Sequence, residues 1–254
     1  MTRYKAIILD LDGTTVPSRK DGMPSEKVKK AVSEAKRYVK VSIATGRPFY
    51  LAELVAKELQ IDQPSVVDGG SEIINPLTHE ILFKKVLPVS TQKQIYNLAK
   101  PFGYDVYTSQ NQEADGRLSS ISQITEDAGK VLIAGVPNKE AINILEELTA
   151  VPEIASHPAS SWTKGDVIDI HITHQEATKK HAVEELLKLL NLASKDVIGV
   201  GDSHNDLPLL SSVGFKVAMG NAPEEIKKIA DYVAPSLEED GVADVIEKFI
   251  LKHA

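Results

Sequence analysis

The segment Ala6-Ile7-Ile8-Leu9-Asp10-Leu11-Asp12-Gly13-Thr14 decides the fold class of this 254-residue chain. Its first four residues form an unbroken apolar run, which is typical of a parallel strand buried on both faces. The run ends in two carboxylates, and a glycine that permits a sharp turn follows them. Strand residues at positions i and i+2 project to the same side, so Asp10 and Asp12 can face one reacting group. Taken alone, a turn rich in Asp and Gly would explain the same residues.

The same design recurs in the first and last thirds of the chain. Apolar residues at helical spacing predict one helix through Val28 and Ala35, a second from about 49 to 59, and a third through Ala182 and Leu190. Further strands are expected at 41–44, 65–67, 197–200, 215–219 and 232–234. This alternation of strands and helices predicts a doubly wound, mostly parallel α/β sheet.

The middle of the chain lacks acids and glycines at its expected strand ends. Candidate strands at 105–108, 131–134 and 167–172 accompany helix patterns at 91–100 and 139–149. We therefore expect residues 84–173 to form a smaller α+β domain, inserted into a sheet domain made of 1–83 and 174–254.

The composition narrows the possible functions. Hydrophobic residues make up 42% of the chain, charged residues 26%, and the formal net charge is -7. The negative charge argues against nucleic acid as a partner, because a phosphate backbone calls for a basic surface. The absence of cysteine excludes disulfides and thiol catalysis. No signal peptide and no membrane-spanning apolar stretch is evident, so we expect a cytoplasmic protein, either a monomer or a homodimer, with no membrane partner.

Reactive side chains follow four of the expected strands. They are Asp10 with Asp12, Thr45, Asp68, and Asp202 with Asp206. In open α/β sheets, ligands bind beyond the carboxyl ends of the strands. Acids gathered at one sheet edge repel each other, and a cation relieves that repulsion. Carboxylate and carbonyl oxygens favour Mg²⁺ over softer metals.

Several separated motifs occur in a characteristic order. They are Asp10-Leu11-Asp12-Gly13-Thr14, Ala44-Thr45-Gly46-Arg47, a lysine at a helix start, and Gly201-Asp202-Ser203-His204-Asn205-Asp206. The set resembles the haloacid dehalogenase superfamily of phosphohydrolases, and more narrowly its Cof-type branch, which carries an inserted cap domain. Ala218-Met219-Gly220-Asn221-Ala222 and Glu239-Asp240-Gly241-Val242-Ala243 extend the resemblance over nearly the whole chain. It implies a Rossmann-like core, an α+β cap, and a Mg²⁺-dependent phosphatase of small phosphorylated metabolites.

The resemblance also implies a role for each motif residue. Asp10 would be the nucleophile that forms an aspartyl-phosphate, and Asp12 the general acid and base. The phosphoryl group would contact Thr45, Gly46, Arg47, Lys179 and Asn205. The metal would be held by Asp10, the backbone carbonyl of Asp12, and Asp202, with Asp206 in support.

Three positions leave alternatives open. The family pattern has Lys-Gly at the helix start, whereas this chain has Lys179-Lys180, and the helical register favours Lys179. Asp68 replaces the usual Asn and is either a turn residue or a functional acid. Arg47 could bind a substrate oxygen or pair with a nearby acid.

Other polar residues are weaker candidates. Asp169, His171 and His174 do not have the spacing of a zinc site. His204 is interpreted as a loop or helix-start residue, and Trp162, the only tryptophan, as either core or cleft lining.

Two other functions remain to be weighed. A phosphosugar mutase would need several basic cap residues to hold a second phosphate, but Arg117 is the only arginine of the inserted segment. A non-hydrolytic phospho-acceptor of the response-regulator kind also uses acids and Mg²⁺. Such proteins lack the second Asp and are about half as long.

Overall fold

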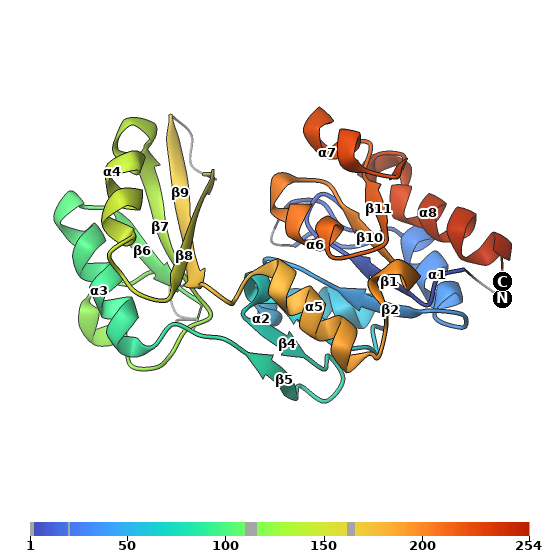
Figure 1. Ribbon diagram of the computed structural model, residues 1–254, viewed down its shortest axis with the longest axis horizontal. Coiled ribbons are helices and arrows are strands. Elements are labelled where there is room, and N and C mark those ends of the chain that lie inside the picture. Colours follow the sequence, from blue (N-terminus) through green and yellow to red (C-terminus); the bar gives the residue numbers. More distant parts are fainter. Residues whose placement is uncertain (1–2, 20, 110–115, 162–165, 254) are drawn as a thin grey trace. The chain divides into compact units, whose positions relative to one another are not determined.

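The computed structural model describes residues 3–19, 21–109, 116–161 and 166–253, and Trp162 lies outside these ranges. The chain divides into two compact units. Unit 1 consists of Met1–Phe83 and Lys179–Ala254, and unit 2 is Lys84–Thr178 (Figure 1).

A parallel sheet forms the centre of unit 1, with the strand order β12-β11-β10-β1-β2 (Figure 1). Its strands are β1 (Ala6–Leu9), β2 (Lys40–Ile43), β10 (Val197–Gly201), β11 (Phe215–Ala218) and β12 (Tyr232–Val233). All four pairings are parallel. All residues of β1 are buried, as a central strand covered on both faces requires. The predicted doubly wound parallel sheet is confirmed.

Helices cover both faces of this sheet. They are α1 (Glu26–Ala35), α2 (Phe49–Glu58), α5 (Lys179–Leu189), α6 (Leu207–Ser211), α7 (Glu224–Ile229) and α8 (Gly241–Phe249). Ile7 and Leu9 belong to the core formed with α1, α2 and α8, whereas Ala6 and Ile8 belong to the core formed with α5 and α6. The alternation of side chains along β1 therefore supplies both cores and leaves the strand's carboxyl end for Asp10.

A second, small sheet in unit 1 was not fully predicted. It consists of β3 (Ser65–Val67), β4 (Glu72–Ile74) and β5 (Ile81–Lys84). β3 pairs antiparallel with β4, and a bridge between Ala44 and Val66 connects this sheet to the end of β2. β3 was expected from the sequence, whereas β4 and β5 were not.

Unit 2 is an α+β unit with a four-stranded antiparallel sheet in the order β6-β7-β9-β8. The strands are β6 (Asp105–Thr108), β7 (Lys130–Pro137), β8 (Ile154–Ser160) and β9 (Val167–His174). α3 (Val89–Ala99) and α4 (Asn138–Leu148) lie on one face of this sheet (Figure 1). β8 was not predicted, because Pro158 and its polar neighbours break the usual strand pattern; as an edge strand it tolerates a proline.

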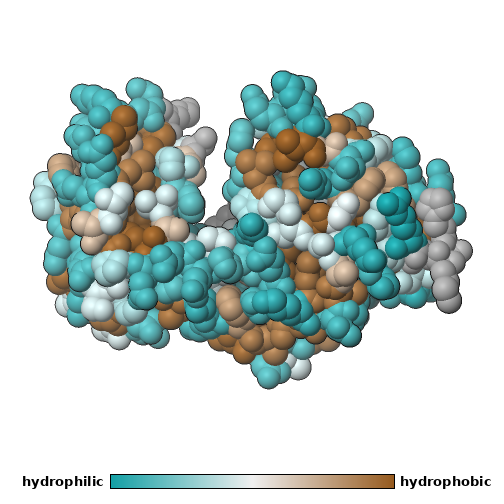
Figure 2. Space-filling view, viewed as in Figure 1, coloured by the Kyte–Doolittle hydropathy of each residue, from teal (hydrophilic) through white to brown (hydrophobic). Residues whose placement is uncertain are grey.

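On the face shown in Figure 2, hydrophilic residues cover much of each unit, and smaller hydrophobic areas lie among these hydrophilic residues. No helix in the described ranges combines the length and apolar character that crossing a membrane would require.

Candidate active site

The loop after β1 brings Asp10 to the carboxyl edge of the parallel sheet. Asp10 is only 3% exposed, its N–H donates to the carbonyl of Val200, and its carbonyl accepts a 2.6 Å hydrogen bond from Thr15 Oγ1. Gly13 turns the loop with φ +81°, a conformation that residues with a Cβ rarely adopt. A Cβ at Gly13 would lie 2.3 Å from Asp202 Oδ2, so glycine is also needed for the close approach of that carboxylate.

Lys179, the first residue of α5, lies between two buried acids. Its Nζ donates to Asp10 Oδ1 at 2.7 Å and to Asp206 Oδ1 at 2.6 Å. Burial alone would lower the pKa of Lys179, but the two carboxylates raise it above its ordinary value, so the amine stays charged. Lys180 is exposed and lies 4.0 Å from Glu184. Of the two candidate lysines, the structure therefore brings Lys179 to the acids.

The loop after β10 supplies two further acids. Asp206 is fully buried, and its Oδ2 accepts hydrogen bonds from the backbone N–H groups of Asp202 and Ser203. Asp202 Oδ1 accepts a 2.9 Å hydrogen bond from Thr14 Oγ1. One carboxylate oxygen from each of Asp10, Asp202 and Asp206 lies within 4.8 Å of the other two. These three residues are called the acidic cluster below.

The acidic cluster fits a divalent cation. Burial raises the pKa of Asp10 to about 8, a shift that Asp206 reinforces and Lys179 opposes. Burial raises the pKa of Asp202 to about 6, although the hydrogen bond from Thr14 opposes that shift. Both carboxylates are thus held where their negative charge is poorly compensated, and a cation among them would remove that penalty. Their hard oxygen atoms suit Mg²⁺.

No comparable group of ligands occurs elsewhere in the described ranges, which include Asp169, His171 and His174.

The Asp12 carboxylate pairs with Arg47. The guanidinium donates from Nε to Asp12 Oδ2 at 2.9 Å and from Nη2 to Asp12 Oδ1 at 2.6 Å. Nη2 also donates to the carbonyl of Arg19 at 2.9 Å. Arg47 is 7% exposed, whereas the Asp12 side chain is 40% exposed. The geometry shows the ion pair that was one of the two possibilities for Arg47.

The loop after β2 places Thr45 and Gly46 beside this pair. Thr45 is fully buried, and its Oγ1 accepts a hydrogen bond from the Arg47 N–H. A Cβ added to Gly46 would meet no atom within 4 Å, so there is open space next to this loop. The Asp68 N–H donates to the Arg47 carbonyl, and the Gly69 N–H donates to the Thr45 carbonyl. Backbone hydrogen bonds therefore connect the loop after β3 to the loop after β2.

Asn205 is not brought to the acidic cluster by any hydrogen bond found in the described part of the chain. It is exposed, and its Oδ1 accepts a hydrogen bond from Ser203 Oγ. His204 starts a short 3-10 turn and is exposed, as expected.

Two residues that contact Asp202 were not predicted as site residues. Thr14 is buried and donates to its Oδ1, and Asn221 Nδ2 lies 3.4 Å from its Oδ2. Both residues belong to motifs on which the family resemblance rests, and that membership could have marked them as site residues.

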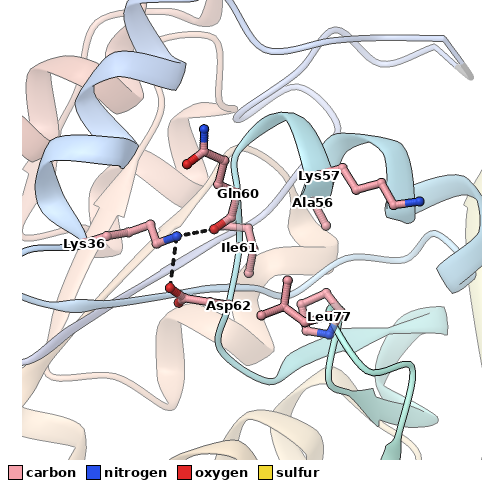
Figure 3. Close-up of a pocket in the computed structure, with 8 residues that line it drawn as sticks. Lys36, Ala56, Lys57, Gln60, Ile61, Asp62 and Leu77 are labelled. Atoms are coloured by element: carbon pink, nitrogen blue, oxygen red, sulfur yellow. Dashed lines mark hydrogen bonds and ion pairs between the residues drawn. The ribbon is translucent and has the colours of Figure 1, made fainter.

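A separate hollow in unit 1 contains none of the predicted site residues (Figure 3). Lys36 lines it and donates to the Gln60 carbonyl and to Asp62, as the dashed lines in Figure 3 show. Ala56, Ile61 and Leu77 supply apolar surface. Asp62 is the one acid among the residues that line this pocket in the described part of the chain, and we assign the pocket no catalytic role.

Comparisons with known proteins show the family to which the chain belongs. The sequence pattern of haloacid dehalogenase-like hydrolases matches residues 7–116 and 112–246. A Bacillus subtilis relative, 5-amino-6-(5-phospho-D-ribitylamino)uracil phosphatase YcsE, is 26% identical, and the match covers 97% of this chain and 96% of that protein. Phosphoglycolate phosphatase 1 of Saccharolobus solfataricus is 42% identical over 89 residues, which are 35% of this chain and 39% of that protein.

A solved structure shows the same fold. The haloacid dehalogenase-like hydrolase from Bacteroides thetaiotaomicron has a TM-score of 0.81 and 27% sequence identity, and the match covers 96% of this chain and 99% of that one.

Proposed function

This chain belongs to the haloacid dehalogenase-like hydrolases, and from that premise we propose that it is a Mg²⁺-dependent phosphomonoesterase that forms an aspartyl-phosphate on Asp10. The observation that carries the proposal is the buried Asp10 carboxylate, held by Lys179 beside Asp202 and Asp206. Lys179 thereby fixes the nucleophile, and the neighbouring acids leave a place for a cation beside it. Phosphoryl transfer depends mainly on such positioning and charge compensation.

In the first step, a carboxylate oxygen of Asp10 attacks the phosphorus, and the bond from phosphorus to the leaving oxygen breaks. Asp12 donates a proton to that oxygen. In the second step, Asp12 takes a proton from water, whose oxygen attacks the phosphorus. The bond from phosphorus to Asp10 breaks, which releases inorganic phosphate and restores both carboxyl groups.

Asp10 and Asp202 would hold Mg²⁺, which supplies charge compensation for the transferring phosphoryl oxygens when it is bound. Asp206 has one oxygen engaged by Lys179 and the other by two backbone N–H groups. We therefore assign Asp206 the role of orienting Lys179 and the Asp202 loop. Thr45 and Gly46 would contact the phosphoryl group beside the open space at Gly46.

For the substrate, we propose a sugar phosphate or a similar small metabolite. The relative named for a phosphoribitylamino substrate matches nearly the whole chain, so the match includes unit 2, whereas the phosphoglycolate phosphatase match covers about a third of it. We further propose that unit 2 is a cap that selects the leaving group, since function resides in sites grafted onto a shared core. A panel of sugar phosphates, polyol phosphates and phosphoglycolate tests this, and a clear preference for phosphoglycolate would contradict it.

The mutase alternative is less favoured by the described part of unit 2. Arg117, the sole arginine of that segment, pairs with Asp105 at 2.6 Å. The phospho-acceptor alternative predicts at most one phosphoryl transfer per molecule, so continued release of phosphate from para-nitrophenyl phosphate excludes it.

Removing divalent cations should abolish turnover. With excess chelator we expect at least a ~100-fold loss of kcat, and added Mg²⁺ should restore it, because Asp10 and Asp202 lose the ion that compensates their charge. Ca²⁺ should bind but support little turnover, since its looser and larger coordination misplaces the nucleophile. The measurement is phosphate release in chelator, Mg²⁺ and Ca²⁺, and full activity in chelator would contradict the proposal.

Asp12→Asn should damage the hydrolysis of poor leaving groups most. The amide keeps an acceptor for Arg47 but has no carboxyl proton to donate, and general acid catalysis contributes about 10²–10⁴-fold. We expect a loss in that range on a sugar phosphate and a clearly smaller loss on para-nitrophenyl phosphate. Single-turnover rates on both substrates measure the first step directly, and equal losses would rule out Asp12 as the acid.

A further inference from the structure

Asn221 connects three segments of unit 1 that are far apart in the sequence. It lies in the loop that follows β11. Its Nδ2 donates to the carbonyl of Gly13 at 2.9 Å and lies 3.4 Å from Asp202 Oδ2, and its Oδ1 accepts a 3.0 Å hydrogen bond from the Leu237 N–H. One carboxamide therefore contacts the loop after β1 through Gly13 and the loop after β10 through Asp202. It also contacts the C-terminal segment after β12 through Leu237.

The contacts fix which way this amide faces. The backbone N–H of Leu237 can only donate, so the amide oxygen of Asn221 must face it. The NH₂ group is then directed at the Gly13 carbonyl and the Asp202 carboxylate, both of which accept. The assignment follows from the hydrogen-bond network and needs no tautomer or proton to be assumed.

Asn221 completes a set of constraints around the Asp202 carboxylate. Thr14 donates to Oδ1, and Gly13 packs so closely that a Cβ there would lie 2.3 Å from Oδ2. Asn221 approaches the same Oδ2 from the loop after β11. The carboxylate is thus contacted by groups of two loops besides its own, and these contacts restrict its orientation.

The C-terminal segment holds Asn221 in turn. The Gly220 N–H donates to the Pro235 carbonyl at 3.2 Å. A Cβ at Gly220 would lie 2.7 Å from the Ser236 nitrogen, and one at Gly241 would lie 2.1 Å from the Pro235 carbonyl oxygen. This packing leaves no room for side chains at the two glycines, and it places the Leu237 N–H against Asn221.

We propose that Asn221 is a positioning residue that orients Asp202 as a ligand and thereby sets the affinity of the acidic cluster for Mg²⁺. The inference rests on the proposed function, in which Asp202 holds the cation. Asn221 does not contact the reacting atoms, so its effect passes through Asp202. Groups that orient a metal ligand in this way typically change metal affinity by about 10–100-fold.

The test is calorimetric titration of the full-length protein with MgCl₂ alone. Asn221→Ala should raise the Kd for Mg²⁺ about tenfold. At saturating Mg²⁺, kcat on para-nitrophenyl phosphate should stay within about threefold of wild type, because the ligand itself remains. The matched control is Asn75→Ala, which removes another turn asparagine whose Oδ1 accepts from the Leu77 N–H away from the acids. It should leave the Kd unchanged.

Urea unfolding in excess chelator separates this role from a merely structural one. A purely structural role predicts lower stability in Asn221→Ala with an unchanged Kd for Mg²⁺, and that result would overturn the inference while leaving the proposed function intact. If the wild-type protein itself bound no Mg²⁺, the metal-dependent function and the inference would both be overturned.

Discussion

Asp10→Asn should lower kcat by at least about 10⁴-fold, a cost of ~5.5 kcal/mol in transition-state stabilisation. The amide has nearly the shape of the carboxylate but cannot act as an attacking anion. The fold should survive, because Lys179 keeps its 2.6 Å contact with Asp206. Steady-state phosphate release and thermal unfolding, measured on the same preparation, provide the two readouts.

A second measurement connects this loss to a covalent step. Acid quenching of the wild-type protein during turnover of a radiolabelled substrate should trap label on the protein, and Asp10→Asn should trap none. Asp21→Asn is the control, since this acid is exposed and pairs only loosely with Arg19 at 3.3 Å. A folded Asp10→Asn protein with rates close to wild type would refute Asp10 as the nucleophile.

The parallel sheet could be predicted because local pattern and buried position coincide there. The run from Ala6 to Leu9 is apolar without interruption, and in the structure all four residues are buried. The residues of such a strand are sufficient to predict it. β8 carries no such signal, since its Ser156-His157-Pro158 stretch becomes a strand only through pairing with β9. Tertiary context overrode local preference at that edge.

In the site, the sequence predicted where the backbone places a residue but not how side chains from different loops meet. Asp10, Thr45 and Asp202 could be predicted as site residues, because each follows a strand whose end is visible in the sequence. The ion pair between Arg47 and Asp12 depends on how side chains from two loops meet. The sequence therefore left it as one of two possibilities. Asn221 belongs to a motif of the family resemblance, but its contact with Gly13, 208 positions away, cannot be predicted from the residues near either position.

Lys179→Met should lower both activity and stability, whereas Lys180→Met should change neither. Lys179 is the cation that Asp10 and Asp206 share, and all three side chains are at most 5% exposed. Removing one partner from such a buried group costs about 3–5 kcal/mol, because the remaining charges are left uncompensated. Loss of a positive group beside the phosphoryl site should also reduce kcat by about 10³-fold.

Lys180→Met is a close control, because the two lysines are adjacent and only one is buried. Lys180 is exposed with Glu184 4.0 Å away, so its replacement should change the free energy of unfolding by at most ~0.5 kcal/mol. Urea unfolding in chelator and phosphate release in saturating Mg²⁺ give the two quantities for each variant. A larger loss in Lys180→Met than in Lys179→Met would reverse the assignment.

The response to Mg²⁺ should distinguish loss of charge from loss of packing in Lys179→Met. The lysine and the proposed cation would both compensate the Asp10 carboxylate, so without the lysine the folded state depends more on the metal. Saturating Mg²⁺ should therefore raise the free energy of unfolding of Lys179→Met by more than it raises that of wild type. If Mg²⁺ stabilised both proteins equally, the charge of Lys179 would not be what holds the acids together.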